Sequence, residues 1–317
     1  MRRVVRASLL LALVVSGLAW SAGVRAGGAI ARERDVEPSM PIDGSSMPID
    51  GSSMPIADSA PPLQQHASAC PTSIPEGMVC IPGGTFTRGD AEDPHASPAE
   101  QVTVSTFLLD AREVTNAQWN ACVAEGACRR LTRFVGYLGA DQPVVAMRWD
   151  EAAAFCARRG ARLPTEAEFE RAASGSADTR YPWGDAPGQG CEHAIVRTRE
   201  GRGCGRDTTW PVGSRAPTEW GLYDISGNVW EWVQDAYSEC YRGCARECGD
   251  ACSGTDPRGP CDGAAECPQA RGLRVVRGGA WWHDIDRATV TARRGVPAAN
   301  PNPHRFGFRC AQSISAP

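Results

Sequence analysis

Apolar and polar residues between positions 77 and 109 follow patterns typical of strands. Residues 102–109 alternate apolar and polar side chains with a period of two, which predicts one half-buried strand. Residues 77–89 place an apolar run before a Pro-Gly-Gly turn and a second short run, which predicts a hairpin. We therefore expect β structure at the start of the folded domain.

Three helices are predicted between residues 115 and 175. Each has a polar residue that can cap its first turn, and each has a glycine beyond its last turn. In the first and third helices a Gln or Glu three residues after the cap completes a capping box. The predicted caps are Thr115 with Gln118, Asp150, and Thr165 with Glu168, and the terminating glycines are Gly126, Gly160 and Gly175.

The N-terminus has the layout of a secretory signal peptide. Basic residues precede an apolar run at 7–19, and small residues stand before Gly27. Because the apolar run is shorter than the ~20 residues of a membrane span, we expect a signal peptide at 1–26 and no transmembrane segment in the mature chain. This predicts export, to a periplasm or to the outside of the cell.

Residues 27–69 are predicted to form a disordered tether. The segment is rich in Ser, Pro, Asp and Gly, and from residue 39 it repeats the pattern Ser-Met-Pro-Ile-Asp-Gly-Ser. It has few large apolar groups, so too little surface can be buried to offset the entropy lost on ordering. The folded domain is expected at 70–317.

Charge and cysteine content narrow the classes of function. The net charge of −4 gives no reason to expect a nucleic acid as partner. The chain has no lysine, which excludes Schiff-base and lysine general-base chemistry. Fourteen cysteines in an exported chain predict a disulfide framework. Six of them lie in a Cys-rich insertion at 236–272, where three disulfides are favoured over a metal cluster.

Four motifs occur in the order characteristic of one protein family. They are Arg-Leu-Pro-Thr-Glu-Ala-Glu at 162–168, Gly-Leu-Tyr-Asp-Ile-Ser-Gly-Asn-Val-Trp-Glu-Trp at 221–232, Arg-Gly-Gly at 277–279 and Gly-Phe-Arg-Cys at 307–310. With these motifs, residues 81–311 resemble the formylglycine-generating enzyme, or sulfatase-modifying factor, family. The resemblance implies an α+β, C-type-lectin-like fold that is rich in disulfides and has little regular secondary structure.

Two disulfides are expected. Cys122 and Cys128 lie close together in sequence around a predicted helix end. Cys156 and Cys310 match a pair that forms a disulfide in the family. The other pairings stay open, because spacing alone does not decide them.

The motif at 221–232 resembles the family's structural calcium site. Carboxylates and backbone carbonyls are hard oxygen donors of the kind that calcium accepts. The alternative is a tight aromatic turn with a solvated Glu231. Calcium is the expected cofactor, and a second site is not expected because its acidic ligand would fall near Gly213. The positions that match the family's ligands are Asp224, Ser226, Gly227, Val229 and Glu231.

The family's catalytic cysteine pair is absent from the matching positions. In the enzymes, two thiolates after the Arg-Gly-Gly motif bind copper(I) and capture the substrate cysteine. Here His283 and Ala288 stand in their places, and imidazole does not reproduce a bis-thiolate site, so copper is not expected. His283 with Asp284 and Asp286 could form a metal or acid–base site instead. Their spacing matches no metal motif, so a structural, hydrogen-bonded His283 is favoured.

A ligand cleft is expected around the same loop. Guanidinium groups can fork onto a carboxylate or a peptide backbone, so a peptide or protein is the expected ligand. Arg309, in the Gly-Phe-Arg-Cys motif, is expected to be a structural ion-pair partner. The expected lining residues are Trp281, Trp282, Arg293, Arg294 and Arg305.

Three classes of function stay open at this stage. The first is an exported binding or accessory domain that keeps the family's cleft without its copper-dependent oxidase chemistry. The second is an active oxidoreductase or protein-modifying enzyme with another metal at His283. The third is a purely structural envelope protein. The altered catalytic positions favour the first class, and the sequence predicts no oligomeric state.

Overall fold

The computed structural model describes residues 69–131, 134–188, 191–237, 252–260, 272–299 and 303–314. The predicted signal peptide, nearly all of the predicted tether and most of the Cys-rich insertion lie outside the described residues. The description below therefore concerns the C-terminal unit, which begins at residue 62.

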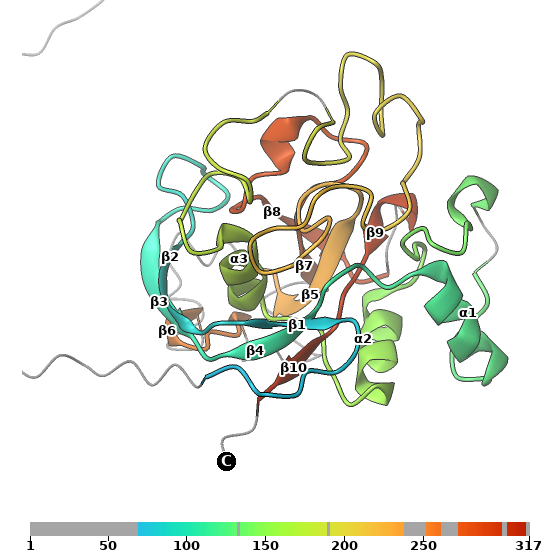
Figure 1. Ribbon diagram of the computed structural model, residues 1–317, viewed down its shortest axis with the longest axis horizontal. Helices are drawn as coiled ribbons and strands as arrows, with labels where there is room; N and C mark the ends of the chain where they lie inside the picture. The colour runs from blue at the N-terminus through green and yellow to red at the C-terminus, as the bar shows by residue number, and fades with distance from the viewer. Residues whose placement is uncertain are drawn as a thin grey trace, which may run out of the picture. The chain divides into compact units, whose positions relative to one another are not determined.

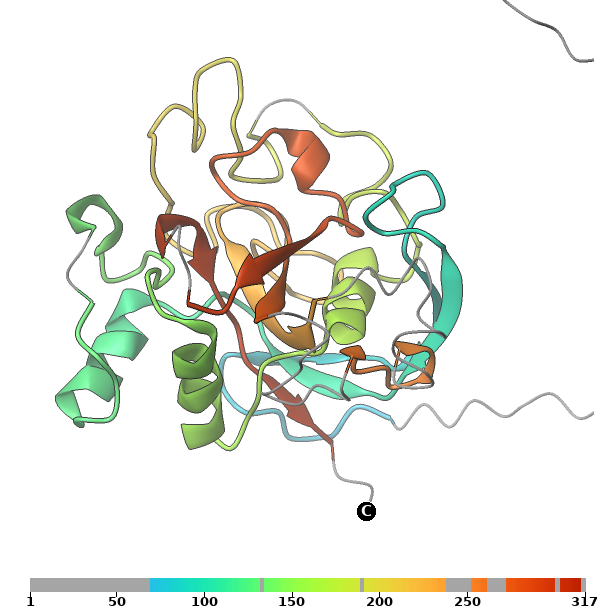
Figure 2. The same cartoon turned by 180° about the vertical axis from the view of Figure 1, so that it is seen from behind.

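Short strands and helices joined by long loops make up this unit (Figures 1 and 2). The strands are β1 Met78–Ile81, β2 Gly84–Arg88, β3 Glu100–Val104, β4 Phe107–Asp110, β5 Trp230–Ala236, β6 Gly254–Thr255, β7 Leu273–Arg277, β8 Arg293–Pro297, β9 Phe306–Gly307 and β10 Ala311–Ser313. The helices are α1 Asn116–Ala124, α2 Trp149–Arg158 and α3 Glu166–Ser174, with short 3-10 helices η1 Val135–Tyr137, η6 Ile285–Arg287 and η7 Pro303–Arg305. The described strands form three small sheets, ordered β1-β4-β10, β2-β3-β6 and β8-β7-β5-β9. The fold is α+β with little regular secondary structure, as the sequence predicts.

The first four strands form one bent antiparallel ribbon. Ile81 lies opposite Phe107 and Gly84 lies opposite Val104, so the register continues unbroken from the β1–β4 pair into the β2–β3 pair. At the corner Gly83 N donates a hydrogen bond of 3.1 Å to the side-chain hydroxyl of Thr106. A Cβ on Gly83 would lie 2.5 Å from the Thr106 backbone nitrogen, so the close approach needs glycine.

This ribbon corrects two of the sequence predictions. The two apolar runs within 77–89 do not pair with each other, since β1 and β2 belong to different sheets. Residues 102–109 are not one strand, because they end β3 and begin β4 with a break at Ser105 and Thr106. The Pro-Gly-Gly segment bends the ribbon instead of reversing the chain, and the opposite strand breaks where the ribbon bends.

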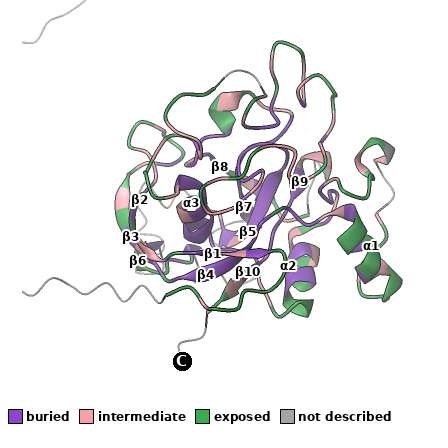
Figure 3. Cartoon of the chain, viewed as in Figure 1, coloured by how far each residue is buried: buried purple, intermediate pink, exposed green. Residues whose placement is uncertain are grey.

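The four-stranded sheet brings together motifs that are far apart in sequence. β5 lies between β7 and β9, with Glu231 opposite Arg277 on one side and opposite Gly307 on the other. The motif at 221–232 therefore ends beside both the Arg-Gly-Gly and the Gly-Phe-Arg-Cys motifs. β5 is almost wholly buried, as its purple colour in Figure 3 shows.

The capping boxes predicted for the first and third helices are present. At the start of α1, Gln118 N donates to Thr115 Oγ1 at 3.3 Å and Thr115 N donates to Gln118 Oε1 at 2.8 Å. At the start of α3, Glu168 N donates to Thr165 Oγ1 at 3.1 Å and Thr165 N donates to the Glu168 carboxylate at 2.8 Å. Each box satisfies two backbone N–H groups that the helix itself leaves open.

The start of α2 differs from the prediction. Its N-cap is Arg148, and Asp150 lies inside the first turn. Arg148 N donates to the Glu151 carboxylate at 2.8 Å, so Glu151, and not Asp150, makes the capping bond at this helix end. Both carboxylates still favour the positive end of the helix dipole. None of the described helices is long and apolar enough to cross a membrane.

Large aromatic residues fill the core. Trp119, Trp232 and Trp281 are almost completely buried. Trp119 stacks on Phe155 with ring centroids 5.6 Å apart, and Phe308 meets the Phe155 ring edge to face at 5.4 Å. Burial of side chains this large supplies much of the apolar stabilisation of a domain with few regular elements.

Buried ion pairs attach α3 to the four-stranded sheet. Arg277 on β7 pairs with Glu170, and neither side chain is exposed. Arg293 on β8 holds Glu166 through bonds of 2.7 and 2.9 Å. Separating a buried carboxylate from its guanidinium partner costs free energy. These pairs therefore fix α3 relative to β7 and β8.

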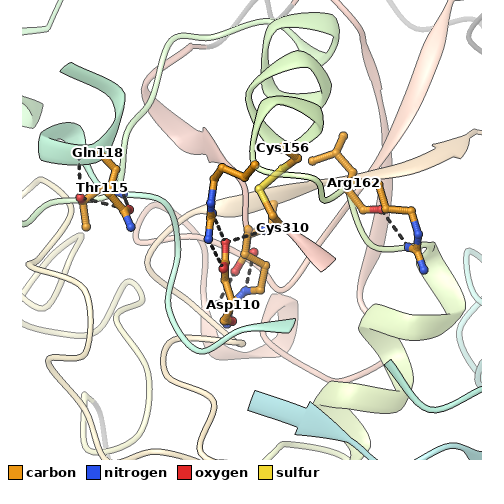
Figure 4. The surroundings of a disulfide bond; sticks show 10 residues. Asp110, Thr115, Gln118, Cys156, Arg162 and Cys310 are labelled. Atoms are coloured by element: carbon orange, nitrogen blue, oxygen red, sulfur yellow. Dashed lines mark hydrogen bonds and ion pairs between the residues drawn. A yellow bond between two sulfur atoms is a disulfide. The ribbon is translucent and has the colours of Figure 1, made fainter. Parts of the chain in front are cut away.

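Disulfides connect the helices and loops. Cys156–Cys310 ties α2 to the segment before β10, and Figure 4 shows Asp110 beside this bond. The Asp110 carboxylate accepts hydrogen bonds from Arg159 at 2.7 and 2.8 Å and from Cys310 N at 3.0 Å. The described disulfides are Cys70–Cys80, Cys122–Cys128, Cys156–Cys310 and Cys191–Cys204, and the second and third are the pairs expected from the sequence.

Candidate functional site

The loop that follows β7 holds His283 and Ala288, the two residues that the sequence analysis matched to the catalytic cysteine positions. Gly278 and Gly279 have φ values of +89° and +79°. A Cβ on Gly278 would lie 2.9 Å from the Ile225 carbonyl oxygen, and one on Gly279 would lie 2.3 Å from that of Arg287. Both positions need glycine because a side chain would meet backbone atoms. These contacts set the position of the residues that follow, including His283.

His283 is a half-buried, uncharged histidine. Its Nδ1 accepts a hydrogen bond of 3.2 Å from Trp230 Nε1. Burial, followed by the positive charges of Arg305 and Arg294, lowers the pKa of His283 to about 4. Since Nδ1 accepts a hydrogen bond, the ring proton is assigned to Nε2. His283 is therefore a neutral imidazole with an N–H at Nε2.

Asp284 and Asp286 do not join His283 in one cluster. The exposed Asp284 carboxylate pairs with Arg197, and exposed Asp286 lies 4.0 Å from the Arg287 guanidinium. Within the described ranges, no group of three or more His, Cys, Asp or Glu side chains is placed to hold a metal ion. The geometry gives no support to a metal or acid–base site at these three residues.

Ala288, the second of these two residues, is closed to solvent. Ala288 is fully buried and packs with Ala194 and Val196 in a small apolar cluster. Its methyl group offers no ligand atom and no nucleophile. The two positions therefore differ in accessibility as well as in chemistry.

A pocket of about 420 Å³ opens beside His283. Arg293 and Arg294, two of the predicted cleft residues, belong to its lining. Buried Arg293 is bound to Glu166, whereas Arg294 is exposed. Arg293 therefore supports the pocket wall and Arg294 can contact a ligand. The lining residues are His95, Trp230, Tyr237, His283, Arg287, Arg293, Arg294 and Gly295.

The other predicted cleft residues lie outside the lining of this pocket. Trp281 is buried, and its Nε1 donates to the His304 carbonyl oxygen at 3.2 Å, so it belongs to the core. Trp282 is half-buried, and two guanidinium groups pack against its ring. The Cζ atoms of Arg202 and Arg305 lie 3.3 and 4.0 Å from its ring centroid. We call these three residues, Arg202, Trp282 and Arg305, the Trp282 ledge.

The predicted calcium ligands lie in a buried turn. Asp224 has a φ of +49°, and its carboxylate accepts a hydrogen bond of 2.5 Å from Gly213 N. Burial raises the pKa of Asp224. Glu231 is buried too, and both of its oxygens accept bonds of 2.7 Å from Arg309. Arg309 is thus the structural ion-pair partner that the sequence predicts.

Glu113 is a third buried carboxylate at this turn. Its Oε2 accepts a hydrogen bond of 2.9 Å from Asn228 Nδ2, while its Oε1 has no hydrogen-bond partner. Ser226 Oγ is likewise buried without a partner. Burial, followed by repulsion from Asp224 and Glu231, raises the pKa of Glu113 well above its usual range. Glu113 could not be found from the four motifs, because it lies outside them, just before α1.

Comparison with known proteins assigns the family. The family model for the sulfatase-modifying factor enzyme 1-like domain matches residues 64–314. The chain belongs to this family. The match covers the whole described unit, from the bent ribbon to β10.

Relatives in this family include proteins named as enzymes and as inactive forms. The formylglycine-generating enzyme of Thermomonospora curvata is 33% identical over 76% of this chain and 95% of its own length. The inactive C-alpha-formylglycine-generating enzyme 2 of Mus musculus is 28% identical over 76% of this chain and 87% of its own. Among solved structures, PvdO from Pseudomonas aeruginosa is similar with a TM-score of 0.59 and 25% identity, covering 75% of this chain and 94% of that one.

Several site residues of this sulfatase-modifying-factor-like domain could not be found from the family motifs. His95 and Tyr237 line the pocket, and Arg202 covers Trp282. Tyr237 packs against Gly295, where an added Cβ would lie 2.4 Å from its ring. A glycine in the middle of a strand, as Gly295 is in β8, is the kind of local signal that marks such a close contact.

Proposed function

We propose that this protein is an exported binding or accessory domain that does not carry out copper-dependent formylglycine synthesis. The observation that supports the proposal is the chemistry at the family's two cysteine positions. His283 is a neutral imidazole bound to Trp230, and Ala288 is a buried methyl group. Neither residue supplies the thiolate that holds copper(I) and captures a substrate cysteine.

The described cysteines offer no substitute pair of thiols. Eight of the nine described cysteines form four disulfides, and the ninth, Cys252, is buried. Because Cys252 is buried, its side chain is not exposed to a substrate peptide. The inactive relative from Mus musculus adds that the family contains members without the activity.

The pocket beside His283 is the proposed ligand site. It combines a concave shape with the neutral imidazole of His283, the exposed arginines Arg287 and Arg294, and Trp230. A concave site with a few convergent polar groups is the usual form of a binding site. A peptide or protein segment is the proposed ligand, because guanidinium groups recognise carboxylates and peptide carbonyls.

Export is proposed from the disulfide framework. Disulfides persist in oxidising compartments and are rare in the reducing cytosol. The four described disulfides hold long loops and two helices, α1 and α2, in place, so the fold depends on such a compartment. This agrees with the signal peptide predicted at 1–26.

A structural calcium ion is proposed at the Asp224 turn. Three buried carboxylates face one buried guanidinium, that of Arg309, and a divalent cation would compensate the excess negative charge. The unpartnered Oε1 of Glu113 is a hard donor suited to calcium. Since Arg309 holds both oxygens of Glu231, Glu113, Asp224 and backbone carbonyls of the turn would hold the ion.

Two measurements on the mature, disulfide-bonded protein test the proposed function. Elemental analysis should find calcium, and no copper or iron near one per chain. A cysteine-containing peptide, incubated with the protein, copper(I) and oxygen, should show no conversion to formylglycine by mass spectrometry, with the Thermomonospora curvata enzyme as positive control. Copper or iron near one per chain, together with peptide conversion that His283→Ala abolishes, would overturn the proposal.

A further inference from the structure

Positive charge gathers beside the His283 pocket without matching carboxylates. Among the residues that the structure describes, Arg294 and Arg305 form no ion pair, and Arg202 has a single contact of 3.9 Å with exposed Asp207. Arg305 Nε donates to His304 Nε2 at 3.2 Å, which is an uncharged acceptor. Burial, followed by repulsion from Arg294 and Arg202, lowers the pKa of Arg305. An anionic ligand would relieve this repulsion.

Within the Trp282 ledge, the indole of Trp282 orients the guanidinium groups of Arg202 and Arg305. Both lie over the indole, with Cζ atoms 3.3 and 4.0 Å from the ring centroid. A guanidinium stacked on a ring keeps its N–H donors at its own edge, where they can fork onto a carboxylate. Stacking also restricts the side chain before any ligand arrives, which lowers the entropy lost on binding. The ledge therefore presents preorganised N–H groups that can donate hydrogen bonds to a carboxylate.

The tryptophans near the pocket leave little free face for a sugar ring. Trp230 and Trp281 are buried. Pairs of guanidinium groups cover Trp282 and, at 3.6 and 4.5 Å, Trp210. Stacking of a sugar on an aromatic face is thus blocked where the charge is concentrated. The available donors are guanidinium edges and the Nε2–H of His283, which suit carboxylates.

We propose that the pocket and the Trp282 ledge bind an acidic peptide segment, whose Asp or Glu carboxylates are held by Arg202, Arg294 and Arg305. This inference rests on the proposed function as a binding domain and names its ligand class. One acidic side chain enters the pocket of about 420 Å³ beside His283 and Arg294. A second carboxylate meets the guanidinium edges of the ledge.

The test measures binding of a fluorescent peptide with alternating Gly and Asp residues to the mature protein, by fluorescence anisotropy. The comparison peptide replaces each Asp with Asn. The Asp peptide should bind at least about tenfold more tightly, because charge-assisted hydrogen bonds replace neutral ones. Arg294→Gln and Arg305→Gln should each weaken binding of the Asp peptide about tenfold. Binding should also weaken as salt is raised.

The matched control is Arg158→Gln. Arg158 is an exposed arginine on α2 that pairs with Glu125, and Figure 1 shows α2 at the opposite edge of the unit from η6. This variant removes the same charge outside the pocket and should bind the Asp peptide like the parent. Thermal unfolding of all three variants checks that each is folded. Melting temperatures close to that of the parent allow changes in binding to be assigned to the site.

Each contrary result overturns a defined claim. Equal binding of the Asp and Asn peptides, or normal binding by folded Arg294→Gln and Arg305→Gln, overturns the acidic ligand and leaves the binding domain in place. Binding of oligogalacturonate without binding of the Asp peptide overturns the peptide class in favour of an acidic glycan. Lack of binding by all these probes also overturns the inference. The proposed function itself would be overturned by a different result, the copper-dependent conversion of a cysteine-containing peptide to formylglycine.

Discussion

Trp230 Nε1 donates a hydrogen bond of 3.2 Å to His283 Nδ1, and the two rings meet at 75° with centroids 5.8 Å apart. His283, which we expect to stand in the place of a catalytic cysteine, is thus held by the motif at 221–232. Trp230 is itself buried at the start of β5, so the imidazole orientation is set by the core. A fixed, neutral His283 suits ligand recognition better than redox chemistry.

His283 is expected to titrate far below an ordinary histidine, with a pKa of about 4. In the unfolded chain its pKa returns to about 6.5, so the unfolded state binds the proton first as pH falls. The free energy of unfolding should therefore decrease between about pH 6.5 and pH 4. Titration of the 15N-labelled imidazole by NMR measures the pKa directly.

Arg294→Gln gives an internal check on the cause of that shift. Removing one nearby positive charge should raise the pKa of His283. Arg158→Gln, which removes an exposed charge on α2, should leave it unchanged. A parent His283 that titrates with an ordinary pKa would show that the ring is solvated instead of half-buried.

The buried pair of Arg277 and Glu170 should be strongly stabilising only as a pair. Glu170→Gln removes the nearer of the two carboxylates that contact the buried Arg277 guanidinium and leaves Glu166 at 3.5 Å. The variant should lower the free energy of unfolding by about 3 kcal/mol. Glu170→Leu combined with Arg277→Met should cost less than the sum of the single changes. Urea unfolding of the parent, Glu170→Leu, Arg277→Met and the double variant completes the cycle. Strict additivity would contradict a direct interaction.

Calcium should raise the thermal stability of the protein through Glu113. At about one hundred times the dissociation constant, a bound ion contributes about 2.7 kcal/mol to the free energy of unfolding. Chelation with EGTA should lower the melting temperature, and Glu113→Gln should remove this response while keeping an acceptor for Asn228. Asp286→Asn, at an exposed carboxylate, should respond like the parent. Identical unfolding curves with calcium and with EGTA would rule the ion out.

The two disulfides expected from the sequence should differ in their contribution to stability. Cys156–Cys310 spans 154 residues, whereas Cys122–Cys128 spans 6. Because a longer closed loop restricts the unfolded chain more, replacing Cys156 and Cys310 with Ala should cost about 2 to 5 kcal/mol, and replacing Cys122 and Cys128 should cost less. Denaturant unfolding at equal pH compares them. A larger loss for the shorter loop would contradict the chain-entropy account.

Helix starts were predictable from sequence where the capping interaction is local. Thr115 with Gln118 and Thr165 with Glu168 close their hydrogen bonds within one helical turn, so a short window of sequence contains both partners. The predicted cap of α2, Asp150, was wrong, because the helix begins earlier, with Arg148 as its N-cap. The structure selects Glu151, which also contacts Arg129 through bonds of 2.8 and 3.0 Å.

Motifs and local patterns in the sequence were enough to identify the family and the starts of α1 and α3. They also predict that His283 and Ala288 stand in the places of the catalytic cysteines. Three further features became known from the folded chain alone: residues 78–110 form a bent ribbon, Glu113 lies near Asp224, and Arg202 covers Trp282. These partners are separated by stretches of chain that no local pattern spans. Their meeting depends on burial and packing summed over the whole domain, which fixes long-range neighbours only when the chain has folded.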